Sequence, residues 1–476
     1  MKELQLSCLQ DFPSYDEGKV RTLFINTYQT LPKGLKIIVL DDDPTGIQTV
    51  HDISVYTAWD EDSIERGFAE TSHLFFILTN SRSLSSSQTK TLHENIAETI
   101  SKVSKKTGKP FIVLSRSDST LRGHYPLETE TIKETLEKTC GYTFDGEIIM
   151  PFFLEGGRYT IDDVHYVRQE ELLIPAAQTE FANDKTFGYH ESNLKEWCEE
   201  KTNHQVKASE VIGIELEDLR TLHIEKIKEQ IESVNHFGKI IVNAIDYCDV
   251  KVFTIAFIQA LSSGKHYLFR CAASIVKVLG GVSDRPLLQR NELINQHKVN
   301  GGIVIAGSHV KKTTQQLEQL KEIPSLKFIE FNQHLVLQKQ GLENEALRVS
   351  RLMNEYISQG KNVVVYTRRQ RIDFPNNDPD ANLAMAVEIS DALTSLVSSL
   401  TYRPSFIIAK GGITSSDIGT KALGVRKAKI MGQVLPGVPV WMTGPESKFP
   451  NLPYIIFPGN VGDIDALKKV VEILIS

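Results

Sequence analysis

KIIVLDDDPTG, residues 36–46, joins a short apolar run to three adjacent carboxylates and a glycine. An apolar run of this length, followed by polar turn residues, is typical of a buried strand in a parallel sheet. Similar runs recur along the chain at 73–79, 111–115, 147–151, 239–244, 266–270, 301–308, 362–367, 405–412 and 454–460. Helical patterns lie between several of them, at 86–105, 126–139, 221–234 and 249–262. This alternation predicts an α/β fold with mostly parallel sheets covered by helices on both faces.

The length of the chain favours more than one domain. Its 476 residues allow two to four domains at roughly 100–200 residues each. The polar segment 281–300 precedes a new strand and is the best candidate boundary. We therefore predict two three-layer α/β/α domains, residues 1–290 and 291–476. We interpret 368–383 as a surface loop before a helix at about 382–400, because strands resume after it.

Composition excludes several classes of protein. The formal charge of −7 gives no sign of the strongly basic surface of a dedicated nucleic-acid binder. The five scattered cysteines lack a C-x-x-C pair, which disfavours a zinc cluster or a disulfide framework and suggests a reducing compartment. We find neither a signal peptide nor a membrane span in the sequence. We expect a cytoplasmic protein with no nucleic-acid or membrane partner, and we allow for a homodimer.

Polar side chains follow the strands of the first half, where ligands of open α/β sheets bind. Asp41, Asp42 and Asp43 repel one another unless a cation or hydroxyl donors satisfy them. Arginines beside hydroxyl groups and carboxylates suit an anionic, polyhydroxylated ligand. The further candidates at these strand ends are Thr45, Arg82, Arg116, Asp118, Ser119, Arg122 and Arg158. The alternatives are structural: an Asx turn or helix cap at the aspartates, and an internal ion pair of Asp118 with Arg116 or Arg122.

The strand ends of the second half are rich in glycine. They carry Gly307-Ser308-His309, Lys410 to Asp417 and Pro458 to Gly462. Glycines let a backbone approach phosphates closely, and helix N-termini add N–H donors. A helix is predicted at 416–423. The P-loop motif G-x-x-x-x-G-K-[ST] and the dinucleotide motif G-x-G-x-x-G are both absent from the sequence. Glycine turns and helix caps are the structural alternative.

Together these motifs resemble the four-carbon acid sugar kinase family, which includes kinases of 3-oxo-tetronate, D-threonate and D-erythronate. The resemblance spans residues 36–465. It is carried by Asp42-Asp43-x-Thr45-Gly46, Asp118-Ser119-Thr120-Leu121-Arg122-Gly123, Gly157-Arg158-x-Thr160, Glu180-x-x-x-Asp184, Gly307-Ser308, Gly411-Gly412-x-Thr414, Pro436-Gly437-Val438-Pro439 and Gly459-Asn460-x-Gly462.

The resemblance implies an amino-terminal sugar-acid-binding domain, a carboxy-terminal nucleotide-binding domain and an active site in the cleft between them. The implied enzyme is a phosphotransferase that uses ATP and Mg²⁺ to phosphorylate a terminal hydroxyl of a four-carbon sugar acid. Asp42, Asp43 or Asp118 would orient that hydroxyl. Substrate contacts are expected from Asp41, Thr45, Arg82, Arg116, Ser119, Arg122 and Arg158. ATP contacts are expected from Ser308, Gly411, Gly412, Ile413, Thr414, Gly459 and Gly462.

Three features depart from the family pattern. Asp41 stands where a small residue is usual, and Ile413 stands where an acid often follows the two glycines. If the acid of the family binds a metal or the ribose of the nucleotide, this contact is lost here or is made by Asp417 instead. We assign no metal ligand. The amino terminus and the 140–240 region are also longer than expected.

Two other functions stay open. A nucleotide-dependent oxidoreductase of a hydroxy acid is disfavoured by the missing dinucleotide motif. A sensor that binds a sugar acid without turnover is the second alternative, suggested by Ile413.

Overall fold

The computed structural model describes residues 1–294, 300–370, 379–459 and 461–475. The chain forms two compact units, one containing Met1–Val50 and Ala58–Asp284 and the other containing His51–Thr57 and Arg285–Ser476. The short segment 51–57 belongs to the second unit because β3 (Ile53–Tyr56) pairs antiparallel with β17 (Lys427–Leu435). The sequence prediction had placed this segment in the first domain. The predicted boundary segment 281–300 lies partly, at 295–299, outside the described residues.

The first unit is built on a parallel sheet. Its strands run in the order β10 (Ile212–Ile214), β11 (Gly238–Val242), β6 (Gly146–Met150), β12 (Tyr267–Cys271), β5 (Phe111–Arg116), β2 (Lys36–Asp41) and β4 (Leu74–Leu78). Each of these neighbouring pairs is parallel. The apolar side chains of β2, among them Ile37, Ile38 and Val39, are fully buried between its neighbours β5 and β4. The continuous apolar runs of the sequence therefore correctly predicted strands covered on both faces.

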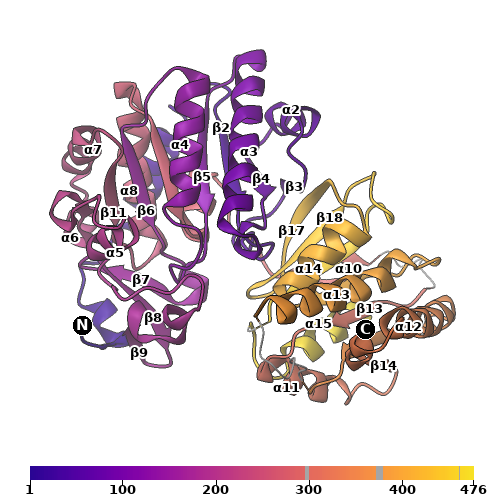
Figure 1. Ribbon diagram of the computed structural model, residues 1–476. Helices are drawn as coiled ribbons and strands as arrows, with labels where there is room; N and C mark the ends of the chain where they lie inside the picture. Colours follow the sequence, from indigo (N-terminus) through magenta and orange to yellow (C-terminus); the bar gives the residue numbers. More distant parts are fainter. Residues whose placement is uncertain (295–299, 371–378, 460, 476) are drawn as a thin grey trace. The chain divides into compact units, whose positions relative to one another are not determined.

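Helices cover both faces of this sheet (Figure 1). On one face, α2 (Glu61–Ala69) packs against α3 (Ser86–Thr107), which packs against α4 (Leu127–Cys140); on the other, α8 (Tyr247–Ala260) contacts α1 (Glu17–Tyr28) and α7 (Ile224–Ser233). A capping box of Ser85 and Gln88 begins α3, and Gly108 ends it in the left-handed conformation. The helices expected at 86–105, 126–139, 221–234 and 249–262 are confirmed.

A small antiparallel sheet is added to the first unit. Its order is β1 (Leu4–Gln5), β9 (Leu172–Pro175), β8 (Val164–Gln169) and β7 (Arg158–Ile161), seen beside the amino terminus in Figure 1. Val167 of this sheet packs with Tyr189 and Trp197 in a buried apolar cluster. The additional residues at the amino terminus and in the 140–240 region thus supply this sheet, which the sequence analysis did not predict.

The second unit combines parallel and antiparallel pairs. The order is β3, β17, β18 (Val438–Thr443), β19 (Pro453–Phe457), β16 (Ile407–Lys410), β13 (Ile303–Ala306), β15 (Val363–Thr367) and β14 (Lys327–Phe331). The pairs from β19 to β14 are parallel, as expected. The pairs from β3 to β19 are antiparallel, which the sequence analysis did not predict.

Two groups of helices accompany this sheet. One contains α11 (Lys311–Leu320) and α15 (Ala466–Ile475); the other contains α12 (Gly341–Ser358), α13 (Pro379–Ser398) and α14 (Gly412–Asp417). Residues 371–378 of the predicted loop 368–383 lie outside the described residues. The last part of the predicted loop, from Pro379, already belongs to α13. Proline is common at the first position of a helix. The helix expected at 416–423 begins earlier, at Gly412, and continues as a π-turn over Ile418–Ala422.

In the part of the chain that the structure describes, none of the helices is both long enough and apolar enough to cross a bilayer.

Candidate functional site

Four neighbouring strands of the first unit end at one edge of the sheet. Asp41, the last residue of β2, lies in register with Leu78 of β4 and with Arg116, the last residue of β5. Arg116 in turn lies in register with Cys271 of β12. The polar segments that follow these strands therefore leave the sheet side by side, as the sequence pattern predicted.

Two arginines form ion pairs with the three aspartates at this edge. Arg82 donates from Nε and Nη2 to the two oxygens of Asp42, at 3.0 and 2.6 Å, and its Nη1 lies 3.7 Å from Asp43. Arg116 Nη1 lies 3.1 Å from Asp41 and 3.4 Å from Asp42. The two-oxygen contact with Asp42 suits the fork of a guanidinium group. The side chain of Asp42 is held from two strands and is 2% exposed.

Asp43 also folds the turn that follows the strand. Its carboxylate accepts hydrogen bonds from the Thr45 amide at 2.8 Å and the Thr45 hydroxyl at 2.5 Å. This is the Asx turn that the sequence left open as an alternative, formed here by one of the three aspartates. A Cβ atom at Gly46 would lie 2.2 Å from an Asp41 oxygen and 2.5 Å from Arg116 Nη1, so the turn can approach the ion pairs only with glycine there.

The next loop, residues 117–123, carries Asp118 and Arg122. Asp118 accepts hydrogen bonds from the Thr120 hydroxyl and from Arg122 Nε, the latter at 2.6 Å. The internal ion pair considered from the sequence thus forms with Arg122. Arg122 Nη1 also lies 3.7 Å from Asp184, which the sequence motif had included. Leu121 has a φ of 68°, a left-handed backbone that is unusual for a residue other than glycine.

Three side chains that the sequence did not assign to the site hold the carbonyl groups of this loop. Arg270 Nη2 donates to the carbonyls of Asp118 and Arg122, at 3.1 and 3.3 Å. The ring nitrogen Nε2 of buried His165 lies 2.7 Å from the Ser119 carbonyl. The Tyr189 hydroxyl donates to the Thr120 carbonyl at 2.8 Å.

His165 lies on β8, and Tyr189 packs in the same buried cluster as that sheet. The antiparallel insertion therefore supports the loop, while the side chain of Ser119 is buried. No local sequence signal marks these contacts, because they join residues far apart in the chain.

A buried carboxylate lies behind the two loops. Glu128, in the first turn of α4, accepts hydrogen bonds from Ser81 at 2.5 Å and from Ser117 at 3.3 Å. Glu128 is 4% exposed. It ties the residues after β4 to those after β5, so it holds the two arginine-bearing segments in place. The sequence analysis missed it because a glutamate in a first helical turn has an ordinary dipole role.

The four aspartates of this edge have different protonation properties. Burial raises the pKa of Asp41 to about 7, against the opposing effect of Arg116, and the neighbouring Asp42 and Asp43 raise it further. Oδ2 of Asp41 is buried without a hydrogen-bond partner among the described residues. Burial also raises the pKa of Asp42.

The pKa values of the other two aspartates are lowered. Burial opposes ionisation of Asp43, but Arg82 and the hydrogen bonds from Thr45 outweigh it and lower the pKa. Arg82 and Arg122 likewise overcome burial at Asp118 and hold its pKa well below the usual range. Asp43 and Asp118 are therefore carboxylates at neutral pH, whereas Asp41 is partly protonated.

Arg158, the remaining predicted substrate contact, begins β7. Its Nη1 donates to the carbonyl of Gly156, and its guanidinium carbon lies 5.6 Å from the centre of the Phe181 ring. Arg122 lies over the same ring at 5.1 Å. The two arginines thus share an aromatic neighbour.

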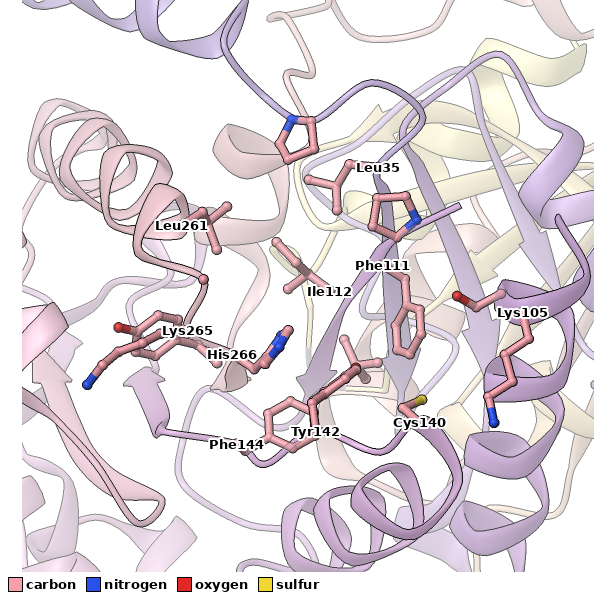
Figure 2. Close-up of a pocket in the computed structure, with 16 residues that line it drawn as sticks. Leu35, Lys105, Phe111, Ile112, Cys140, Tyr142, Phe144, Leu261, Lys265 and His266 are labelled. Atoms are coloured by element: carbon pink, nitrogen blue, oxygen red, sulfur yellow. The ribbon is translucent and has the colours of Figure 1, made fainter. Parts of the chain in front are cut away.

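An apolar pocket of about 290 Å³ lies at the opposite edge of the same sheet (Figure 2). Its lining includes Leu35, Phe111, Phe144 and His266, which stand at or just before the first residues of four strands. The ring of His266 stacks on Tyr142 with centres 3.8 Å apart. This pocket is lined mainly by apolar and aromatic side chains and lies away from the ionic edge.

In the second unit, the predicted glycine segments meet at the carboxyl ends of β13, β16 and β19. A Cβ atom on Gly411, whose φ is +120°, would lie 3.4 Å from Cβ of Ser308 and 3.5 Å from Oγ1 of Thr414. A Cβ atom on Gly459 would lie 3.6 Å from Oγ of Ser308. Ser308, Gly411, Thr414 and Gly459 are therefore brought together, with the glycines beside the side chains of Ser308 and Thr414.

Two cationic side chains accompany these glycines. Lys410 is fully buried, and its Nζ donates to the carbonyls of Pro458 at 3.0 Å and Gly459 at 3.3 Å. Arg369 donates to the Ser308 carbonyl at 2.7 Å and to the Thr314 hydroxyl at 3.1 Å. Burial, together with Lys312 and Arg369, lowers the pKa of Lys410 to about 7.

Both cations could have been noticed in the sequence. Lys410 directly precedes the glycine pair, and Arg369 lies in the basic run at 368–371. Neither position was assigned to the site.

The other predicted nucleotide contacts are arranged differently. Ile413 is 63% exposed. Gly462 has a φ of 78° in the turn before α15, where a Cβ atom would lie 2.5 Å from the Ala466 side chain. Asp417 accepts from the Ser390 hydroxyl at 2.8 Å and lies 3.3 Å from Lys421. Asn460 of the motif lies outside the described residues. Among the residues described, no group of three His, Cys, Asp or Glu side chains is placed to hold a metal.

The raised pKa of Asp41 predicts a pH-dependent effect of Asp41→Asn. The folded protein binds a proton here between pH 4 and pH 7 that the unfolded chain has already released, so wild-type stability falls as pH rises through this range. The asparagine variant lacks this penalty. Its free energy of unfolding relative to wild type should therefore improve by about 1–4 kcal/mol between pH 5 and pH 8. Urea unfolding at several pH values measures this difference.

Asp62→Asn is the matched control, because Asp62 is an exposed carboxylate in α2 paired with Arg66. The control should show no such trend. A constant difference between Asp41→Asn and wild type across this pH range would show that Asp41 is ionised throughout.

Comparison with known proteins agrees with the division of the chain. A family model described as a sugar-binding N-terminal domain matches residues 37–279, and one described as a nucleotide-binding C-terminal domain matches residues 303–467. We find no significant match among curated proteins.

Two solved structures share the fold. A Salmonella typhimurium LT2 protein with a provisional tRNA synthase name is 16% identical, with a TM-score of 0.62 over 91% of this chain and 98% of its own. Haemophilus influenzae protein HI1011, of the DUF1537 family, is 16% identical, with a TM-score of 0.60 over 92% of this chain and 100% of its own. With its sugar-binding and nucleotide-binding parts in this order, the chain belongs to the four-carbon acid sugar kinase family.

Proposed function

We propose that this protein is an ATP-dependent kinase that phosphorylates a terminal hydroxyl of a four-carbon sugar acid. The observation that carries the proposal is the different chemistry of the two carboxyl edges. One presents aspartates and arginines within a sugar-binding domain, and the other presents glycines and cations within a nucleotide-binding domain.

The first edge has the groups that a sugar acid needs. Carboxylates accept hydrogen bonds from hydroxyl groups, and arginines bind an acid group through paired N–H donors. Asp43 and Asp118 are ionised, and their side chains are 20% and 13% exposed, whereas those of Asp41 and Asp42 are 1% and 2% exposed. Asp43 and Asp118 are therefore the aspartates best placed to touch a ligand. Asp42 serves mainly to hold Arg82.

The second edge has the groups that a nucleotide needs. Gly411 and Gly459 leave the backbone open beside Ser308, so phosphate oxygens can approach its N–H groups closely. Arg369 supplies positive charge at the same place, and Lys410, whose pKa is lowered to about 7, is partly charged at neutral pH. The two side chains fix the carbonyls of Gly459 and Ser308. Mg²⁺ would arrive with the nucleotide, where most of its ligands are phosphate oxygens and water, and would neutralise phosphate charge.

Phosphoryl transfer then depends mainly on position and charge. The terminal hydroxyl oxygen of the acid forms a bond to the γ-phosphorus as the bond to the β-phosphate bridging oxygen breaks, giving ADP and a phosphomonoester. Asp118 or Asp43 orients the hydroxyl and accepts its proton. A carboxylate with a lowered pKa is a weak base, which suits a loose transition state in which the proton leaves late.

Nucleotide specificity is the first test. ATP with Mg²⁺ should raise the midpoint of thermal unfolding, since a ligand at 100 times its Kd adds about 2.7 kcal/mol of stability. NAD and NADP should have no such effect at equal concentration. Stabilisation by NAD or NADP alone would support the hydroxy-acid oxidoreductase instead and would rule out the kinase.

Turnover with an aspartate variant is the second test. Coupled measurement of ADP release over threonate, erythronate and their oxo forms should identify at least one substrate. With it, Asp118→Asn should lower kcat by at least about 100-fold, because a positioned acid or base contributes 10²–10⁴-fold. Asp145→Asn is the control, since Asp145 lies at the other edge of the sheet and accepts from the His266 amide.

An unchanged kcat in Asp118→Asn would remove Asp118 from the site. If the protein binds an acid tightly but releases no ADP with any member of the panel, the non-catalytic sensor is favoured.

A further inference from the structure

The arginines at the carboxyl edge of the first unit differ in how their charge is balanced. Arg82, Arg116 and Arg122 each have an aspartate oxygen within 4.0 Å. Among the described residues, Arg158 and Arg270 have no carboxylate within that distance. An acidic ligand gains most from a cation that the protein itself has not paired.

Arg270 is placed behind the loop and not in front of it. Its side chain is among the largest that are fully buried, and the residue is 1% exposed. Its Nη2 donates to the carbonyls of Asp118 and Arg122, whereas its Nε and Nη1 are buried without a hydrogen-bond partner among the described residues. Arg270 therefore supports the loop from inside the unit, and a ligand at the edge would not reach it without displacing the loop.

Arg158 is only half-buried, and its donors are not all used. Nη1 donates to the Gly156 carbonyl, while Nε is buried without a hydrogen-bond partner in the described part of the chain. Burial lowers the pKa of Arg158, Asp118 opposes that effect, and Arg122 adds to it. A guanidinium nevertheless stays charged in proteins. The site thus contains a cation with no carboxylate within 4.0 Å among the described residues, although Asp118 and Glu180 act on its charge from farther away.

The position of this cation is fixed from several sides. Phe181, from the segment after β9, lies beneath both Arg158 and Arg122. The charges of both arginines lower the pKa of Tyr189, against the larger effect of burial. The Tyr189 hydroxyl donates to the Thr120 carbonyl in the loop of Asp118. Arg158 is therefore held near the loop, and its Nη2, which makes no hydrogen bond to the described residues, is the nitrogen left for an anion.

Charge is unevenly distributed along the edge. Asp41, Asp42 and Asp43 gather at the end of β2, where a second acid group would be repelled. Asp118 is within electrostatic range of both Arg82 and Arg158. A short molecule with an acid group at one end and hydroxyls along the rest matches this order.

We propose that Arg158 binds the carboxylate of the substrate, and that the hydroxyl chain runs from there past Asp118 toward Asp43. The inference rests on the proposed function for the substrate class. It makes Arg158 the residue that distinguishes a sugar acid from an uncharged polyol of the same length.

The test compares an acid with its uncharged amide. Calorimetry measures the binding of a four-carbon aldonic acid and its primary amide to wild type, Arg158→Gln, Arg158→Lys and Arg168→Gln. Arg158→Gln should weaken the acid by about 10- to 100-fold, since a hydrogen bond to a charged group contributes about 1.5–3 kcal/mol. The amide should bind both proteins within about threefold. Arg158→Lys should restore part of the affinity for the acid.

Arg168→Gln is the control, because Arg168 lies on the next strand of the same sheet with a 44% exposed side chain and donates to the Glu170 carbonyl. It should leave both affinities unchanged. Equal weakening of acid and amide in Arg158→Gln, or no weakening of either, would overturn the proposal.

The outcomes separate this inference from the kinase function. Suppose that Arg158→Gln loses acid binding and that the wild-type protein phosphorylates none of the acids. This result would support the carboxylate contact and reject the kinase. Phosphorylation with unchanged acid affinity in the variant would do the reverse. Absence of acid binding by wild type would overturn both.

Discussion

Burial of two carboxylates, Asp41 and Asp42, beside the more exposed Asp43 at the end of a strand is the constraint on which the first unit depends. Asp41 and Asp42 are almost inaccessible to water, so their charges must be balanced by the protein or removed by protonation. Arg82 and Arg116 provide the balance, and burial with neighbouring charge shifts the protonation of Asp41. Removing one partner of such a buried pair commonly costs about 3–5 kcal/mol.

The balance exists only because the strands lie in a particular order. Arg116 reaches Asp41 because β5 lies beside β2 in register, and Arg82 follows β4 on the other side of β2. Gly46 lets the turn pass close to the ion pair, and Glu128 ties the two flanking segments together. The antiparallel insertion then holds the loop of Asp118 through its carbonyls. The order of the strands thus positions the charged side chains of this edge, and most of these side chains already form ion pairs or hydrogen bonds with one another.

The second unit uses the same kind of edge for a different chemistry. Where the first unit places carboxylates, the second places Gly411 and Gly459, with buried Lys410 bonded to the Gly459 carbonyl and half-buried Arg369 bonded to the Ser308 carbonyl. Such an edge favours phosphates through backbone N–H groups and positive charge. Two similar folds therefore differ in function through the residues that follow their strands.

The sequence predicted what local patterns encode. Buried strands such as 36–41, capped helices such as α3, and the convergence of Asp41, Arg82 and Arg116 all follow from apolar runs and from the geometry of parallel sheets. Two features depend on contacts between distant residues and were missed. One is the pairing of β3 with β17, two strands that lie far apart in the sequence. The other is the set of hydrogen bonds from Arg270, His165 and Tyr189 to the carbonyls of the distant loop 117–123. Likewise, only the three-dimensional structure shows that Arg158 has no carboxylate within 4.0 Å among the described residues.

Phosphorus NMR of the complete reaction tests the central claim most directly. Protein, ATP, Mg²⁺ and a four-carbon sugar acid are followed by the resonances of the γ-phosphate and of any new phosphorus species. The account predicts that the γ-phosphate signal is replaced, one for one, by a phosphomonoester coupled to the protons of the terminal carbon of the acid. Conversion of ATP only to inorganic phosphate, or unchanged ATP with every acid of the series, would contradict it.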